Sequence, residues 1–254
     1  VLIGFVIIGG IKRIAAVTSK LVPSMAIIYI LSALAILVVN LEYIPAAVSS
    51  IFVGAFSPEG VTGGFMGVLI LGFRRAVFSN EAGIGSAPIA HSAAKTDEPS
   101  TEGIVSLLEP FIDTVVICTM TALVIIVTGV FSGQEGIEGA RLTSEAFGSV
   151  LPWFPYVLAF VAVLFAFSTA ISWSYYGVKA VTFIFGEVRS AELIYKIVFC
   201  IFAVIGSSLD LEKVIDLSDS ALFLMAIPNL IGVYLLASVV KMEYIRYQEK
   251  INNG

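Results

Sequence analysis

Residues 74–88 read Arg-Arg-Ala-Val-Phe-Ser-Asn-Glu-Ala-Gly-Ile-Gly-Ser-Ala-Pro and lie inside the long, mainly apolar segment 60–95. Each charged side chain at the centre of a bilayer costs about 2.5–3.5 kcal/mol even on the lenient insertion scale. A plain membrane-spanning helix would therefore not carry two arginines, an asparagine and a glutamate near its middle. The glycines and the proline that follow tolerate non-helical backbone. The segment predicts a helix interrupted over residues 78–85, whose bare amides and carbonyls line a cavity.

The composition of the whole chain points to a membrane environment. Of its 254 residues, 58% are hydrophobic and 13% are charged, and the mean hydropathy is +1.00. Soluble domains carry about 25% charged residues. The composition excludes a soluble globular protein, a disordered chain, a disulfide scaffold and a nucleic-acid-binding protein. It predicts an all-α polytopic membrane protein with the lipid bilayer as its partner, organised as one transmembrane domain over residues 1–254.

Uncharged runs mark the expected helices. Residues 1–10 are too few to span a bilayer, so we expect them to end a helix that begins before this chain, which would then be N-terminally incomplete. Residues 44–56 are also too short and predict an interfacial or re-entrant helix. The remaining uncharged runs are 21–39, 60–73, 82–94, 114–131, 151–178, 197–209 and 220–240, and the runs 60–73 and 82–94 are the two halves of the interrupted segment 60–95.

Basic residues predict the orientation. When the chain crosses the membrane at each segment, ten of the fourteen basic residues fall on one side, from Lys12 to Lys250. The positive-inside rule makes that side the cytoplasm, so we expect a cytoplasmic C-terminus and an external loop 132–145. A cytoplasmic loop at Arg74 and Arg75, between two short helices, is the alternative to an interrupted helix. It would invert every later loop and remove this charge bias.

Several polar residues inside apolar segments are candidates for function. Ser168 and Thr169 lie in a long uncharged run, where hydroxyls either bond back to their own helix or bind a hard cation. Trp173, four residues after Thr169, shares its helical face and is a candidate pocket wall. Glu109 and Asp113 are four apart, and they are either proton or ion sites or structural groups.

The single histidine has a packing interpretation and a functional one. His91 lies in an alanine-rich half-helix, where a packed or hydrogen-bonded role is more common than a pH-sensing one. A pair of arginines near a glutamate favours a structural ion pair, and we expect Arg74 and Arg75 to bind Glu81 or Glu59. The roles of His91, Glu109 and Asp113 stay open at this level.

The segment around the expected interruption also resembles a known family. Residues 75–88 are similar to the signature of the alanine/glycine:cation symporters, the sodium:alanine symporter family. The resemblance extends to residues 9–14 and 20–23, to 111–119, and to the run Phe-Ser-Thr-Ala-Ile-Ser-Trp-Ser-Tyr-Tyr-Gly at 167–177. It therefore covers nearly the whole chain.

The resemblance implies a leucine-transporter-type fold of two inverted five-helix repeats, of which this chain would cover the part from the end of the fourth helix to the tenth. The seventh to tenth helices would then be 103–131, 151–185, 191–209 and 214–240. It implies sodium-coupled symport of small neutral amino acids, alanine or glycine, across the cytoplasmic membrane by alternating access, with sodium as the co-transported ion and no cofactor. The implied substrate-binding residues are Phe78, Ser79, Asn80, Gly83, Thr169 and Trp173. Ser168 and Thr169 are the implied sodium ligands. The family's broken first helix has no counterpart in this chain.

Three alternatives remain beside this interpretation. The first is a proton-coupled amino-acid transporter of the same superfamily. The second is a channel, although no repeated ring-forming polar stripe is present. The third is an intramembrane enzyme, although Ser86 and His91 would point about 140° apart on a helix, which disfavours a hydrolase dyad.

Overall fold

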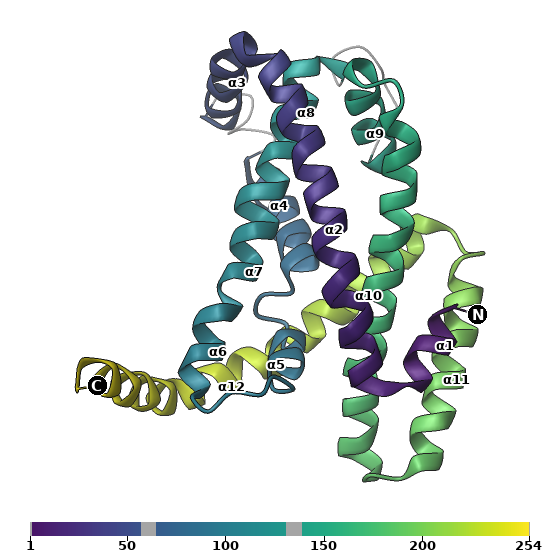
Figure 1. Cartoon of the computed structure of the whole chain (residues 1–254), viewed down its shortest axis with the longest axis vertical. Coiled ribbons are helices and arrows are strands. Elements are labelled where there is room, and N and C mark those ends of the chain that lie inside the picture. Colours follow the sequence, from purple (N-terminus) through teal and green to yellow (C-terminus); the bar gives the residue numbers. More distant parts are fainter. Residues whose placement is uncertain (1, 57–64, 131–138, 254) are drawn as a thin grey trace. The chain divides into compact units, whose positions relative to one another are not determined.

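The computed structural model describes residues 2–56, 65–130 and 139–253, and no β-strand occurs among them. The chain divides into two compact units. Unit 1 is Val1–Gly67 with Val116–Phe202, and unit 2 is Val68–Val115 with Ala203–Gly254. Figure 1 shows helices throughout the described chain. The predicted all-α class is confirmed for these residues.

Long helices dominate unit 1. Its elements are α1 (Leu2–Ile8), α2 (Gly10–Val39), the 3-10 helix η1 (Leu41–Tyr43), α3 (Ile44–Phe56), α8 (Thr119–Thr128), α9 (Gly139–Val150), α10 (Phe154–Phe185) and most of α11 (Arg189–Gly206).

Unit 2 has shorter helices and one very long helix. Its elements are most of α4 (Phe65–Asn80), α5 (Ser86–His91), α6 (Pro99–Ser106), α7 (Leu108–Pro110), the first part of the π-helix η3 (Phe111–Cys118) and α12 (Leu211–Asn253).

Four helical stretches of the described chain are long and apolar enough to cross a membrane. They are Gly10–Val39, Pro99–Thr128, Phe154–Phe185 and Leu211–Asn253. Each overlaps a segment expected from the sequence. The 18-residue helix α11 is amphipathic, with Arg189, Glu192 and Lys196 in its first turns, and does not meet the same criterion. The chain is thus a multi-pass membrane protein by its helices.

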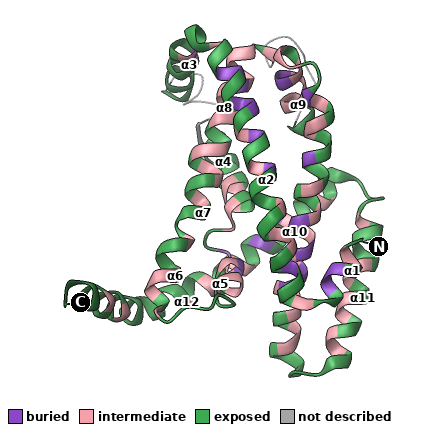
Figure 2. Ribbon diagram, viewed as in Figure 1, coloured by how far each residue is buried: buried purple, intermediate pink, exposed green. Residues whose placement is uncertain are grey.

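The described core lies in unit 1. Aromatic rings stack at its centre: Phe147 of α9 lies 4.6 Å from Phe154 of α10 and 5.3 Å from Tyr29 of α2, measured between ring centroids. The Tyr29 hydroxyl makes a 2.6 Å hydrogen bond with Thr121 of α8. Figure 2 shows these buried positions in purple along α2, α8, α9 and α10. This cluster fixes α10, the helix that carries Ser168, Thr169 and Trp173.

One expected boundary is wrong. The sequence predicts a loop before residue 21, but α2 already begins at Gly10, which has a φ of +67°. Lys12, Arg13 and Lys20 therefore lie on helical turns. An apolar run marks which residues prefer lipid, and a helix can continue past that run into polar surroundings. Part of the expected external loop 132–145 lies outside the described residues.

Candidate functional site

The candidate site is an interruption between α4 and α5. The α4 helix ends at Asn80 and α5 begins at Ser86. Three residues between them have left-handed backbone: Glu81 with a φ of +57°, Gly83 with +82° and Gly85 with +92°. Glu81 is the one described residue other than glycine with a positive φ. Such a conformation is unfavourable for a side-chain-bearing residue, so the surrounding contacts must hold it.

The expected limits of the interruption need a correction. The sequence predicts that it starts at residue 78, but Phe78, Ser79 and Asn80 form the last turn of α4. Nothing in these three side chains opposes helical backbone. Asn80 then ends the helix, because its Oδ1 accepts a 3.0 Å hydrogen bond from the amide of Ala82. Asparagine commonly makes such local bonds to the chain two residues on.

The interruption leaves hydrogen-bond donors without partners. The amides of Gly83 and Gly85 donate to no other described residue, whereas the Glu81 amide bonds the Val77 carbonyl. The Ser86 hydroxyl is fully buried and also has no partner among the described residues. Buried polar groups in native proteins are almost always paired. Gly83 is exposed and Gly85 is half-buried, so their two amides are the groups of the interruption that could bind a ligand.

The last turn of α4 is bonded to the π-helix. The Ser79 hydroxyl donates to Asp113 Oδ2 at 2.7 Å, and Asn80 Nδ2 donates to the Thr114 hydroxyl at 2.9 Å. The Thr114 hydroxyl in turn donates to Asp113 Oδ2 at 3.1 Å. Asp113 is thus a half-buried carboxylate beside the interruption. The π-helix η3 replaces the α-helix expected here, and π geometry is frequent at functional sites.

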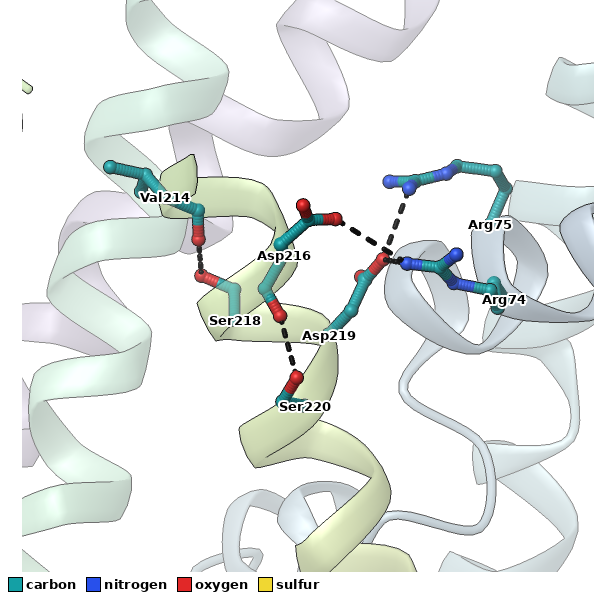
Figure 3. Close-up of polar contacts among 7 residues, drawn as sticks. All are labelled: Arg74, Arg75, Val214, Asp216, Ser218, Asp219 and Ser220. Atoms are coloured by element: carbon teal, nitrogen blue, oxygen red, sulfur yellow. Dashed lines mark hydrogen bonds and ion pairs between the residues drawn. The ribbon is translucent and has the colours of Figure 1, made fainter. Parts of the chain in front are cut away.

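Two arginines of α4 share one carboxylate of α12 (Figure 3). Arg74 lies 2.6 Å and Arg75 3.0 Å from Asp219 Oδ2, whose side chain is 4% exposed. Asp216 lies farther away, 3.8 Å from Arg74, and is 70% exposed. The expected ion pair thus involves Asp219, a partner that sequence reasoning missed. The one available signal was a pair of aspartates at the start of an apolar run. Glu59, one of the two glutamates that the sequence offered as partners of Arg74 and Arg75, lies outside the described residues.

His91, the last residue of α5, lies between two glutamates. Its Nδ1 lies 2.6 Å from Glu102, and its Nε2 lies 3.5 Å from Glu109. His91 and Glu102 border a cavity of about 530 Å³ between α5 and α6, which Pro88, Thr96 and Ser106 also line. His91 is thus hydrogen-bonded, one of the roles that the sequence left open.

The predicted cation ligands lie on α10 in unit 1. Ser168 is buried, and its hydroxyl donates to the Phe165 carbonyl of its own helix at 2.9 Å. Thr169 is exposed, with no hydrogen bond from its hydroxyl to any described residue. Trp173 packs edge-on against Tyr176, with ring centroids 5.5 Å apart. No group of three or more His, Cys, Asp or Glu suited to a metal occurs among the described residues.

The predicted site residues thus fall into two sets. Phe78, Ser79, Asn80 and Gly83 gather at the interruption in unit 2, and Ser168, Thr169 and Trp173 share α10 in unit 1. Within unit 2, the structure adds Asp113, Thr114, Asp219 and Asn229, none of which the sequence assigned to a substrate site.

An interrupted apolar helix with unpaired amides, in a chain of membrane-spanning helices, is typical of secondary transporters. The comparisons agree, because the chain matches the sodium:alanine symporter family over residues 1–254. It belongs to that family. The family and the named relatives are transporters, not enzymes.

Three curated relatives illustrate the match. The chain is 42% identical to the sodium/alanine symporter AgcS of Methanococcus maripaludis, over 96% of this chain and 54% of AgcS. It is 37% identical to the amino-acid carrier protein AlsT of Bacillus subtilis, over 100% of this chain and 54% of AlsT. It is 34% identical to the putative sodium/proton-dependent alanine carrier protein YrbD of the same organism, over 100% of this chain and 56% of YrbD. The chain spans about half the length of these relatives.

Proposed function

We propose that the complete protein is a secondary transporter that couples uptake of a small neutral amino acid, alanine or glycine, to sodium entry. The observation that carries this proposal is the interruption at residues 81–85, with its unpaired amides inside an otherwise apolar helical chain. The names of AgcS and AlsT support amino-acid cargo. A leucine-transporter-type fold and a cytoplasmic C-terminus belong to the same proposal.

The interruption suits the carboxylate of an amino acid. Left-handed residues at alternate positions 81, 83 and 85 can turn backbone amides into a concave group of donors, a known form of anion site. The amides of Gly83 and Gly85 are free to bind a carboxylate, and the Asn80 side chain stands beside them. Phe78, which is 46% exposed, would cover the bound substrate.

Sodium would bind oxygen atoms of α10. The Ser168 hydroxyl donates its proton to a backbone carbonyl, which leaves its oxygen lone pairs free for a cation. The Thr169 hydroxyl is also available. Hydroxyl and carbonyl oxygens are the ligands that hard cations prefer. Sodium and amino acid would be coupled because each favours the conformation that binds the other.

Proton coupling is a second candidate, and Asp113 favours it. This carboxylate lies within a span-length helical stretch and bonds two hydroxyls beside the interruption. Carboxylates in such positions are proton-relay candidates. The name of YrbD also leaves both cations open for that relative.

Uptake of labelled alanine into proteoliposomes tests the proposal. We expect uptake driven by an inward sodium gradient, and little uptake when choline replaces sodium. A proton gradient that drives uptake without sodium would favour the second candidate. Flux that needs neither gradient would contradict both and favour a channel.

A variant tests the cation ligands. Thr169→Ala should raise the sodium concentration that half-activates uptake about 10- to 150-fold, because one oxygen ligand is lost, worth about 1.5–3 kcal/mol on the scale of a hydrogen bond to a charged group. Thr182→Ala is the matched control, since Thr182 lies on the same helix and bonds only the Lys179 carbonyl. Unchanged sodium activation in Thr169→Ala would remove Thr169 from the site.

A further inference from the structure

Asn229 of α12 contacts the interruption at two points. Its Nδ2 donates a 2.9 Å hydrogen bond to the carbonyl of Gly83. The backbone of Gly85 passes so close that a Cβ there would lie 3.1 Å from Asn229 Cγ and Oδ1. One side chain, 146 residues away in sequence from Gly83, therefore contacts the chain on both sides of Ile84.

The first contact fixes a whole peptide group. A peptide unit is planar and trans, so its carbonyl and the next amide point in opposite directions. Holding the Gly83 carbonyl against α12 turns the Ile84 amide away from it, toward the Glu81 carbonyl at 3.4 Å. The Asn229 bond thus restrains the ψ of Gly83 and the φ of Ile84, the two torsions on either side of this peptide group, in the middle of the turn that holds Gly83 and Gly85.

The contact requires a donor at position 229. A backbone carbonyl oxygen can only accept hydrogen bonds, so the amide nitrogen of Asn229, not its oxygen, faces Gly83. The second contact requires a compact side chain, because Gly85 leaves no spare room beside Asn229. Asparagine meets both conditions. Aspartate has the same size but offers acceptors only.

We propose that Asn229 is a positioning residue for substrate binding: it holds the interruption in the shape that presents the amides of Gly83 and Gly85. This inference rests on the proposed function of the interruption as the substrate site. Preorganised sites bind more tightly because the ligand does not have to order them. Asn229 therefore acts on substrate affinity through the backbone, without touching the substrate.

Two variants of the complete transporter test the donor. Asn229→Ala removes the bond, and we expect the half-saturating alanine concentration to rise about 2- to 12-fold, the range of one net hydrogen bond. Asn229→Asp keeps the size but sets an acceptor against the Gly83 carbonyl, so we expect a larger rise. The maximal uptake rate per molecule should change less than the half-saturating concentration in both variants.

Ser220→Ala is the matched control. Ser220 lies on the same helix and bonds only the Asp216 carbonyl of that helix. It should leave the half-saturating concentration unchanged. Hydrogen–deuterium exchange of residues 80–86 gives a second measurement that needs no transport. It should be faster in both Asn229 variants and unchanged in Ser220→Ala.

The outcomes separate this inference from the proposed function. An unchanged half-saturating concentration in both Asn229 variants overturns the inference, as does a rise equal to that of Ser220→Ala. If the wild-type protein shows no cation-driven uptake, the proposed function fails. Faster exchange in the Asn229 variants would then still support the positioning of the turn, and unchanged exchange would overturn it too.

Discussion

Gly85 faces two separate obstacles to replacement. Its φ of +92° is unfavourable for any residue with a Cβ, and that Cβ would press on Asn229. We expect Gly85→Ala to lower the free energy of unfolding by about 1–2 kcal/mol from the backbone alone. Gly103→Ala is the control, because a Cβ on Gly103 meets no atom within 4 Å. Thermal unfolding of the purified variants measures both, and equal melting temperatures would contradict the assignment.

Ser86 offers a test of opposite sign. Its hydroxyl is buried without a described partner, so its removal loses no hydrogen bond. We expect Ser86→Ala to raise the free energy of unfolding by about 1 kcal/mol, because an unpaired buried polar group is a penalty of this order.

Ser174→Ala is the comparison for Ser86→Ala. Ser174 is equally buried, but its hydroxyl donates to the Ile171 carbonyl at 2.6 Å. This variant should be neutral or destabilised. Chemical denaturation of both proteins decides the point, and a loss of stability in Ser86→Ala would mean that its hydroxyl is satisfied.

At the scale of elements, α4 and α12 are joined by charge as well as by the Asn229 bond. Asp219 is almost fully buried and receives both arginines, whereas Asp216 is mostly exposed. Asp219→Asn should lower the free energy of unfolding by about 1.5–3 kcal/mol, the range for hydrogen bonds to charged groups. Asp216→Asn should change it by less than about 1 kcal/mol, as exposed pairs do.

Thermal unfolding in detergent, at one pH and one salt concentration, measures the Asp219 and Asp216 variants. Comparable melting temperatures of the two variants would contradict the conclusion that Asp219 is the main partner of the two arginines. Removing Arg74 in the Asp219→Asn background should then have a smaller effect than in the wild type, because the two share one interaction.

The elements also show what a sequence can predict. The interruption was predictable because glycines, a proline and mid-helix charges report on local backbone and local burial. The helix end at Asn80 was less predictable, because the decisive bond from Asn80 to Ala82 is a choice among several polar side chains. Asp219 and Asn229 were not predictable as partners. Their contacts join positions about 145 residues apart, and one sequence carries no signal for that pairing.

At the scale of the whole molecule, the C-terminal tail reaches back across the sequence. Lys250 of α12 binds Glu98 just before α6, and this hydrogen bond holds the pKa of Glu98 below its usual range. A lowered pKa means that the contact stabilises the fold above the ordinary pKa of glutamate, about 4.3, and that this contribution is lost as the pH falls. We expect the tail to become more accessible to protease below about pH 4, where Glu98 becomes protonated, and in high salt.

Lys250→Met tests whether the pH dependence of cleavage comes from the contact between Lys250 and Glu98 or from other carboxylates. The variant should be cleaved equally fast above and below the transition, whereas the wild type should be protected only at the higher pH. Lys241→Met is the control on the same helix and should behave as the wild type. A pH dependence that survives in Lys250→Met would assign the tail's attachment to other groups.

The orientation of the chain is the remaining large-scale expectation. Ten of fourteen basic residues fall on one side in the predicted topology, and that bias places the tail of α12 in the cytoplasm and α9 outside. Single cysteines at Asn252 and Arg141 test on which side of the membrane the tail of α12 and α9 lie, once Cys118 and Cys200 have been replaced. A membrane-impermeant maleimide should label Arg141→Cys in intact cells and Asn252→Cys only after permeabilisation. Because the bias depends on treating residues 60–95 as one interrupted span, and the two-helix alternative inverts every later loop, the reverse pattern at both Arg141 and Asn252 would restore that alternative.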